Sequence, residues 1–220
     1  MTRLPAWVEY GAFTLALLAG MVNAVGLLGF QHQSVSHLSG TATLLGTAVF
    51  GPLPDSLHLL AILLSFLAGS MLSGFFVSGE SLRMGRHYDS LLLAESLLLV
   101  LAIVFLQHHA AAGHYFASAA CGLQNALATR YSGAIVRTTH ITGVVTDLGI
   151  MLGAMLRGEA LDRRKLLLFV LIISGFVAGG SIGALLYPLY QFMTLALPAA
   201  ICVLLALGYR LYSRKQQQAG

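Results

Sequence analysis

Two short blocks of the sequence carry the same polar residues in the same order. The block His-Leu-Ser-Gly at 37–40 recurs 103 positions later as His-Ile-Thr-Gly at 140–143. Histidine changes its charge near neutral pH, and the free N–H groups at a helix start attract anions or other electron-rich atoms. If each block begins a helix inside a membrane, the two N-termini would form a donor-rich site near the bilayer midplane.

An amide side chain also recurs, inside two apolar segments. Gly-Met-Val-Asn-Ala at 20–24 matches Gly-Leu-Gln-Asn-Ala at 122–126 in its Gly, Asn and Ala positions. An amide in a membrane is costly unless it is hydrogen-bonded, so each one either contacts a solute or holds the non-helical chain nearby. Ser and Thr in the first pair of blocks have the alternative role of capping a helix. The candidate solute-binding residues are Asn23, His37, Ser39, Gly40, Asn125, His140, Thr142 and Gly143.

Charged residues break the match between the two halves. Asp147 falls where the first half has Leu44, and an acid within a membrane is a functional candidate by default. We expect Asp147 to serve coupling; the alternatives are a salt bridge to Arg137 or Arg130, or an exposed position near the cytoplasmic end. Glu95 lies one turn inside its apolar segment and is expected to reach the cytoplasmic surface or to pair with a loop arginine. Five histidines are expected at the outer surface, with no spacing that argues for a metal site: 32, 58, 108, 109 and 114.

The composition explains why these few polar residues matter. Of the 220 residues, 57% are hydrophobic and 9% are charged, and the mean hydropathy is +0.82. A soluble domain carries about 25% charged residues, so this chain is predicted to be an all-α integral membrane protein. Two cysteines provide no disulfide framework or zinc spacing, and we predict neither a metal nor a cofactor. The net charge of +4 is typical of basic cytoplasmic loops and needs no nucleic acid as a partner.

The apolar segments predict how the chain crosses the bilayer. A span needs about 20 apolar residues, and six segments are long enough, at about 8–29, 57–78, 91–107, 111–129, 165–186 and 189–211. Two more, at about 37–51 and 140–156, are short. If both short segments turn back without crossing, all twelve basic residues fall on one side, which satisfies the preference of Lys and Arg for the cytoplasm. We therefore predict six transmembrane helices plus two re-entrant half-helices, with both termini cytoplasmic; eight crossings are the alternative.

The matched blocks indicate an internal repeat within a single membrane domain covering 1–220. The repeats extend over about 5–107 and about 110–212. A third matched element follows the half-helices, as a ladder of small residues suited to close helix packing within the monomer, or alternatively to a homodimer: Ser65, Gly69, Ser73, Gly175, Gly179 and Gly183. Three spans per repeat is an odd number, so the second repeat would enter from the opposite side. This predicts two inverted 3+3 repeats, an arrangement common in secondary transporters.

The second-half blocks, Gly-Leu-Gln-Asn-Ala at 122–126 and Thr-Thr-His-Ile-Thr-Gly at 138–143, resemble the YoaK family, also called the DUF1275 domain. The resemblance covers nearly the whole chain. It implies a small multi-pass protein of the bacterial inner membrane but little chemistry. Asn23 stands where the family often has Asp, and Thr41 where it often has Asn. Both departures argue against a proton or cation role for the first half.

The function expected from these residues is that of a small secondary transporter or permease for a polar or anionic solute, with a channel as a variant. A non-transporting assembly protein is one alternative. An intramembrane serine hydrolase is another, with Ser36 or Ser39 paired to His37 or His140, but no Gly-x-Ser-x-Gly elbow is present. We therefore expect no enzyme activity. The expected partners are the lipid bilayer and an unidentified small solute.

Overall fold

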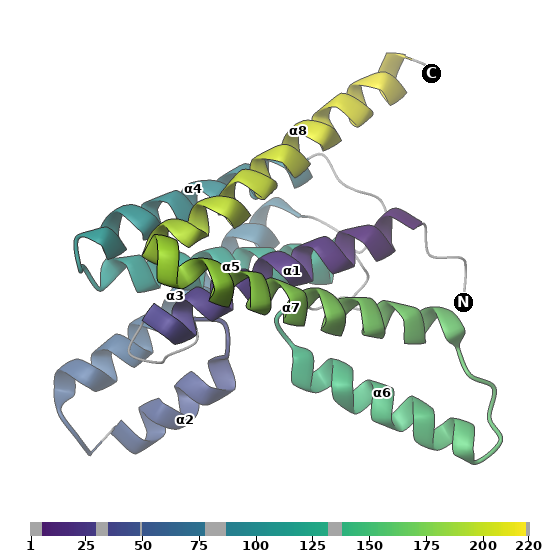
Figure 1. Cartoon of the computed structure of the whole chain (residues 1–220), viewed down its shortest axis with the longest axis horizontal. Helices are drawn as coiled ribbons and strands as arrows, with labels where there is room; N and C mark the ends of the chain where they lie inside the picture. Colours follow the sequence, from purple (N-terminus) through teal and green to yellow (C-terminus); the bar gives the residue numbers. More distant parts are fainter. Residues whose placement is uncertain (1–5, 30–34, 49, 78–86, 132–137, 219–220) are drawn as a thin grey trace.

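The computed structural model describes residues 6–29, 35–48, 50–77, 87–131 and 138–218, and regular structure in these ranges is helical (Figure 1). The helices, in chain order, are α1 (Ala6–Gly29), α2 (Leu38–Ala48), α3 (Leu53–Phe76), α4 (Tyr88–Gln107), α5 (Ala112–Tyr131), α6 (Ile141–Leu156), α7 (Arg163–Tyr190), the 3₁₀ turn η1 (Gln191–Leu195) and α8 (Ala196–Gln218).

Length and hydropathy mark four candidate membrane spans in the described residues: Glu9–Gly29, Leu53–Phe76, Tyr88–Gln107 and Arg163–Arg214. The last contains 52 residues and includes α7, η1 and most of α8. At 1.5 Å per residue, α1 and α3, with 24 residues each, are about 36 Å long, which exceeds the ~30 Å of hydrocarbon. The 11 residues of α2 reach only about 16 Å and the 16 of α6 about 24 Å. The long apolar helices are those of a membrane protein.

Helix α5 is as long as α4 but is not among the four candidate spans. Its sequence is rich in Ala, Gly and polar side chains, and its residues from Ala117 to Gln124 are buried apart from Ala119. A helix enclosed by other helices needs no apolar exterior, and small side chains let its neighbours approach closely. The low hydropathy of α5 therefore fits its position inside the protein.

Helix α1 packs along α7, with glycines at the places where the two backbones meet. A Cβ added at Gly20 would overlap the carbonyl oxygen of Phe176. A Cβ added at Gly179 would overlap the carbonyl oxygen of Leu17. The contact therefore depends on the missing side chains at these positions.

Helix α3 packs along α5 in the same manner. A Cβ at Gly122 would overlap the carbonyl oxygen of Phe66, and one at Gly69 would overlap that of Ala119. The two helix pairs share a pattern. On α7 and on α3, a phenylalanine carbonyl faces a glycine of the partner helix, and a glycine three residues further along the same helix faces a carbonyl of that partner.

The remaining helices pack around these two pairs. Helix α4 packs against both α5 and α8, while α2 packs on α3 and α6 on α7. Between α7 and α8, Pro188 removes a helical hydrogen-bond donor and Gln191 takes a φ of 50°, so the chain turns through η1. The two cores are filled by large side chains that are buried on all sides, including Phe169, Leu123 and Leu127 in one and Leu99 and Leu195 in the other.

Candidate functional site

The short helix α6 begins with a histidine that caps it. His140 has φ −97° and ψ 55°, and its ring Nδ1 accepts a hydrogen bond from the backbone N–H of Gly143 at 3.2 Å. The His140 carbonyl also accepts the N–H of Val144 at 3.2 Å. A Cβ at Gly143 would overlap the imidazole ring, so glycine is required for this cap. This local geometry explains the His-Ile-Thr-Gly block: the His140 ring accepts an N–H group at the helix start, and Gly143 leaves room for the ring.

The start of α2 has the same arrangement. The Thr41 N–H donates to the His37 carbonyl at 3.1 Å, and a Cβ at Gly40 would lie 2.7 Å from the His37 Nδ1. The Ser39 hydroxyl lies 3.2 Å from the His37 Nε2. The side chains of His37 and Ser39 are exposed on the surface of the chain, as are those of His140 and Thr142 in the second half.

The hydroxyl-bearing residues of the two starts accept matching hydrogen bonds. The Thr43 hydroxyl donates to the Ser39 carbonyl at 2.9 Å, and the Thr146 hydroxyl donates to the Thr142 carbonyl at 2.8 Å. At α6 the capping group that the structure shows is the ring of His140, whereas the sequence offered Thr142 as a possible cap.

The two amides have different surroundings. The Ser36 hydroxyl, which is buried, donates to the Asn23 Oδ1 at 2.8 Å and joins α1 to the residues before α2. In the second half, the Asn125 Oδ1 and the Thr138 hydroxyl are buried and have no hydrogen-bond partner among the described residues. The first position is therefore bonded internally, while the second keeps polar atoms that could bind a small molecule or water.

Figure 1 shows how the two short helices are oriented. In this view the N-terminal ends of α2 and α6 lie towards the middle of the protein, and their C-terminal ends point towards opposite sides. The structure thus places each block at the start of a short helix.

The other predicted residues are placed as follows. Asp147 is exposed on α6, and Arg137 lies outside the described residues, so the proposed pairing is not described. In the small-residue ladder, Ser73 is buried and Ser65 donates to its own helix, at the Ala61 carbonyl, at 2.7 Å. The glycines of the ladder lie at helix crossings, with α1 beside Gly175, Gly179 and Gly183 and α5 beside Gly69.

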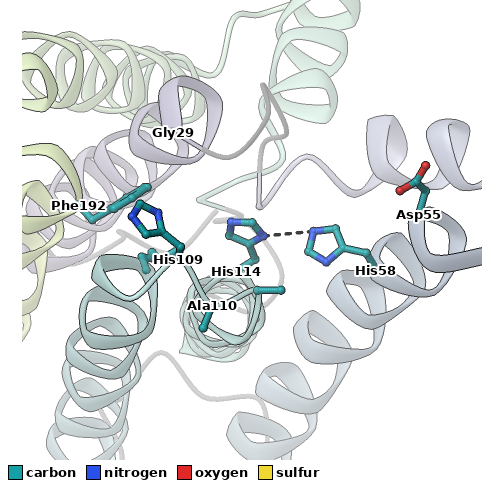
Figure 2. Close-up of a pocket in the computed structure, with 9 residues that line it drawn as sticks. Gly29, Asp55, His58, His109, Ala110, His114 and Phe192 are labelled. Atoms are coloured by element: carbon teal, nitrogen blue, oxygen red, sulfur yellow. Dashed lines mark hydrogen bonds between the residues drawn. The ribbon is translucent and has the colours of Figure 1, made fainter.

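A cavity of about 320 Å³ lies where α1 and α4 end and α3 and α5 begin (Figure 2). Its lining includes Asp55, His58, His109 and His114, together with Gly29, Leu106, Ala110, Ala111 and Phe192. The His114 Nδ1 lies 3.2 Å from the His58 Nε2, and the His58 Nδ1 lies 3.0 Å from the Tyr115 hydroxyl. A chain of three hydrogen-bonding groups therefore reaches this cavity. The sequence interpretation grouped these histidines on one surface but did not predict a cavity, because its walls come from separate segments.

The expectation for Glu95 was wrong. Its side chain is buried, with 2% of the residue exposed, and the Cys202 thiol of α8 is its hydrogen-bond partner. It reaches neither the surface nor a described arginine. A nearby acid, Asp89, does pair with an arginine, because the Arg210 Nε contacts the Asp89 Oδ2. That pair ties the start of α4 to α8.

The fold and these polar groups define an all-helical membrane protein in which two short helices begin at matching histidines, one of which, His140, caps its helix. The chain belongs to the family described as "Protein of unknown function (DUF1275)", whose model matches residues 11–208. Comparisons with curated proteins and with solved structures found no match.

Proposed function

We propose that this protein is a small secondary transporter or permease for a polar or anionic solute. The observation that carries the proposal is that the two short helices, α2 and α6, begin with the same arrangement of residues. Each begins with a histidine packed against a glycine three residues later, and each histidine precedes an exposed Ser or Thr by two residues. Two such starts offer backbone N–H groups, imidazoles and hydroxyls to one solute.

The helix contacts support an inverted repeat as the underlying architecture. The α1–α7 pair and the α3–α5 pair each join the first span of one repeat to the second span of the other. The carbonyls of Leu17 and Ala119, 102 positions apart, face Gly179 and Gly69. Two copies related by a pseudo-twofold axis in the membrane plane would make these reciprocal contacts. In this proposal α1, α3, α4, α5, α7 and α8 cross the membrane, and α2 and α6 enter it partway.

The distribution of charge supports the orientation. With six crossings, all twelve Lys and Arg residues fall on one side, so both termini face the cytoplasm of a bacterial cell. The cavity at the ends of α1 and α4 then lies on the outer side. We propose that it is the outer entrance, because its carboxylate and imidazoles can exchange hydrogen bonds with a polar solute.

Transport can be tested without knowing the solute. Proteoliposomes are incubated with a cell extract, washed, and their contents compared with those of protein-free vesicles by mass spectrometry. We expect the wild-type protein to enrich at least one polar or anionic solute. A vesicle preparation that enriches none, while a control transporter remains active, would contradict the proposal.

Two glycines on α6 provide matched variants for this assay. In Gly143→Ala the new methyl displaces the His140 ring and removes a cap that stabilises the helix start by about 1 kcal/mol, so uptake should fall below that of the wild type. In Gly149→Ala nothing lies within 4 Å of the added Cβ, and uptake should stay near the wild-type value. Equal uptake by the two variants would exclude the helix start from the solute site.

One contact favours a second candidate, the intramembrane serine hydrolase. The Ser39 hydroxyl and the His37 Nε2 lie 3.2 Å apart, which is within reach for a nucleophile and its base. A fluorophosphonate probe tests this directly. Labelling of Ser39 that disappears in His37→Ala would support the hydrolase, and an unlabelled wild-type protein would exclude it.

A further inference from the structure

Glu95 is a carboxyl group enclosed within the membrane-spanning part of the bundle. Only 2% of the residue is exposed, and its Oε2 has no hydrogen-bond partner among the described residues. On its own helix, the side chains of Leu91, Leu92 and Leu99 are buried too. A carboxyl group placed here, with one oxygen unpaired, is not part of an ion pair that holds helices together.

The helices packed against α4 bring no positive charge to this group. From α8 the Cys202 thiol is its hydrogen-bond partner, and from α5 Cys121 is close enough to interact with it electrostatically. The one described arginine that pairs with α4, Arg210, contacts Asp89, six residues and about 9 Å along the helix axis from Glu95. The partners of Glu95 identified among the described residues are thus two thiols and no arginine or lysine.

This environment selects a proton as the bound species. A carboxylate taken out of water without a counter-ion costs several kcal/mol. Metal cations such as Ca²⁺ and Mg²⁺ bind through several oxygen ligands. Among the described residues no cluster of three or more His, Cys, Asp or Glu side chains includes Glu95. A proton needs no further ligand. It neutralises the acid and leaves the thiol contact intact.

We propose that Glu95 is the proton-binding group that couples solute movement to a proton gradient. The inference rests on the proposed transport function and adds its coupling ion. It places a proton role in the first half on Glu95, and not on the Asn23 and Thr41 positions at which the family departures argue against one. Cys121 lies one helical turn before Asn125 on α5, so Glu95 interacts electrostatically with the helix that carries one of the candidate solute-binding amides. Loss of the proton would leave a charge that needs water, and α4, α5 and α8 must separate to admit it. Proton release is thereby tied to a change in the packing around α5.

The first measurement needs no solute. Dicyclohexylcarbodiimide, an apolar reagent, adds a protonated carboxyl group across one of its C=N bonds and forms a stable N-acylurea without a leaving group. We expect Glu95 to be labelled in vesicles, with the rate falling about tenfold per pH unit once the group loses its proton. Infrared difference spectra should show the carbonyl stretch of a protonated carboxylic acid fading over the same pH range.

Two variants test whether the labelling and the titrating band come from Glu95. Glu95→Gln keeps the shape and neutrality of the protonated acid, so it should fold normally, remain unlabelled and lack the titrating band. Glu159→Gln removes an exposed acid that pairs with Arg157, and it should behave like the wild-type protein. No labelling of Glu95 at any pH, or an acid band that does not change with pH, would overturn the proposal even if transport is observed. Conversely, reversible titration of Glu95 in a protein that moves no solute would contradict the transport function and leave the proton site established.

Discussion

Replacement of a single glycine at the α1–α7 crossing should destabilise the protein measurably. In Gly179→Ala the added methyl would overlap the carbonyl oxygen of Leu17, which belongs to a helix backbone and cannot rotate away. The helices must shift or separate, and overpacking of this kind costs about 1–3 kcal/mol. For a chain of this size each kcal/mol lowers the melting temperature by about 2–4 °C, which gives an expected decrease of about 2–12 °C.

A matched control is available on α6. Nothing lies within 4 Å of a Cβ added at Gly153, and alanine is the better helix former by about 1 kcal/mol. Gly153→Ala should therefore melt at the wild-type temperature or up to about 4 °C higher. The assay is thermal unfolding in detergent with a thiol-reactive dye, because both cysteines, Cys121 and Cys202, are buried and react only after the bundle opens.

The same assay tests the reciprocal packing of the two halves. Gly69→Ala pushes a methyl into the Ala119 carbonyl, as Gly179→Ala does into the Leu17 carbonyl, so the two variants should lose similar stability. If Gly179→Ala melts within about 2 °C of Gly153→Ala, the close crossing described here is not what holds α1 and α7 together. If only one of the two crossing variants is destabilised, the crossings are not equivalent.

Two further substitutions test single polar contacts. The buried Ser118 hydroxyl donates to the carbonyls of Val35, at 3.2 Å, and Ile62, at 2.9 Å, so Ser118→Ala should cost about 1 kcal/mol and lower the melting temperature by about 2–4 °C. A wild-type melting curve would show that the bridge contributes nothing. Arg210→Gln breaks the half-exposed pair with Asp89, and we expect a loss of at most about 1 kcal/mol at low salt. That loss should shrink in about 1 M salt, where screening acts over about 3 Å, and a salt-independent loss would point to packing rather than charge.

Much of the fold could be predicted because membrane helices are constrained by length. The eight α-helices of the described residues fall on the eight apolar segments identified in the sequence, including the short ones now seen as α2 and α6. Their ends were predicted less well. Helix α7 begins at Arg163, because the Asp162 side chain accepts the N–H groups of Arg164 and Lys165 at 3.1 Å. This cap was visible in the sequence, but hydropathy alone does not use it.

The parts that could not be predicted depend on which face of a helix is buried. Helix α4 is apolar on all sides, so its sequence does not show that Glu95 points towards α8 instead of the surface. The cavity near His58 and His114 could not be predicted either, because the segments that line it are adjacent only after folding. The cap at His140 was missed for a different reason. Histidine is not a preferred capping residue, so Ser39 and Thr142 were the capping candidates that the sequence offered.

One face of α5 connects the polar features described above. His114, Ser118, Cys121 and Asn125 recur at steps of four, three and four residues, which places them on one face of the helix. That face reaches the outer cavity at His114, the residues before α2 through the Ser118 bond to Val35, and the buried acid at Cys121. From His114 to Asn125 it extends about 16 Å, roughly half of the hydrocarbon thickness. A helix with this polar face is too costly to present to lipid, which is why α5 is enclosed. Movement of α5 relative to α3 and α4 would change the outer cavity, the acid and the amide together.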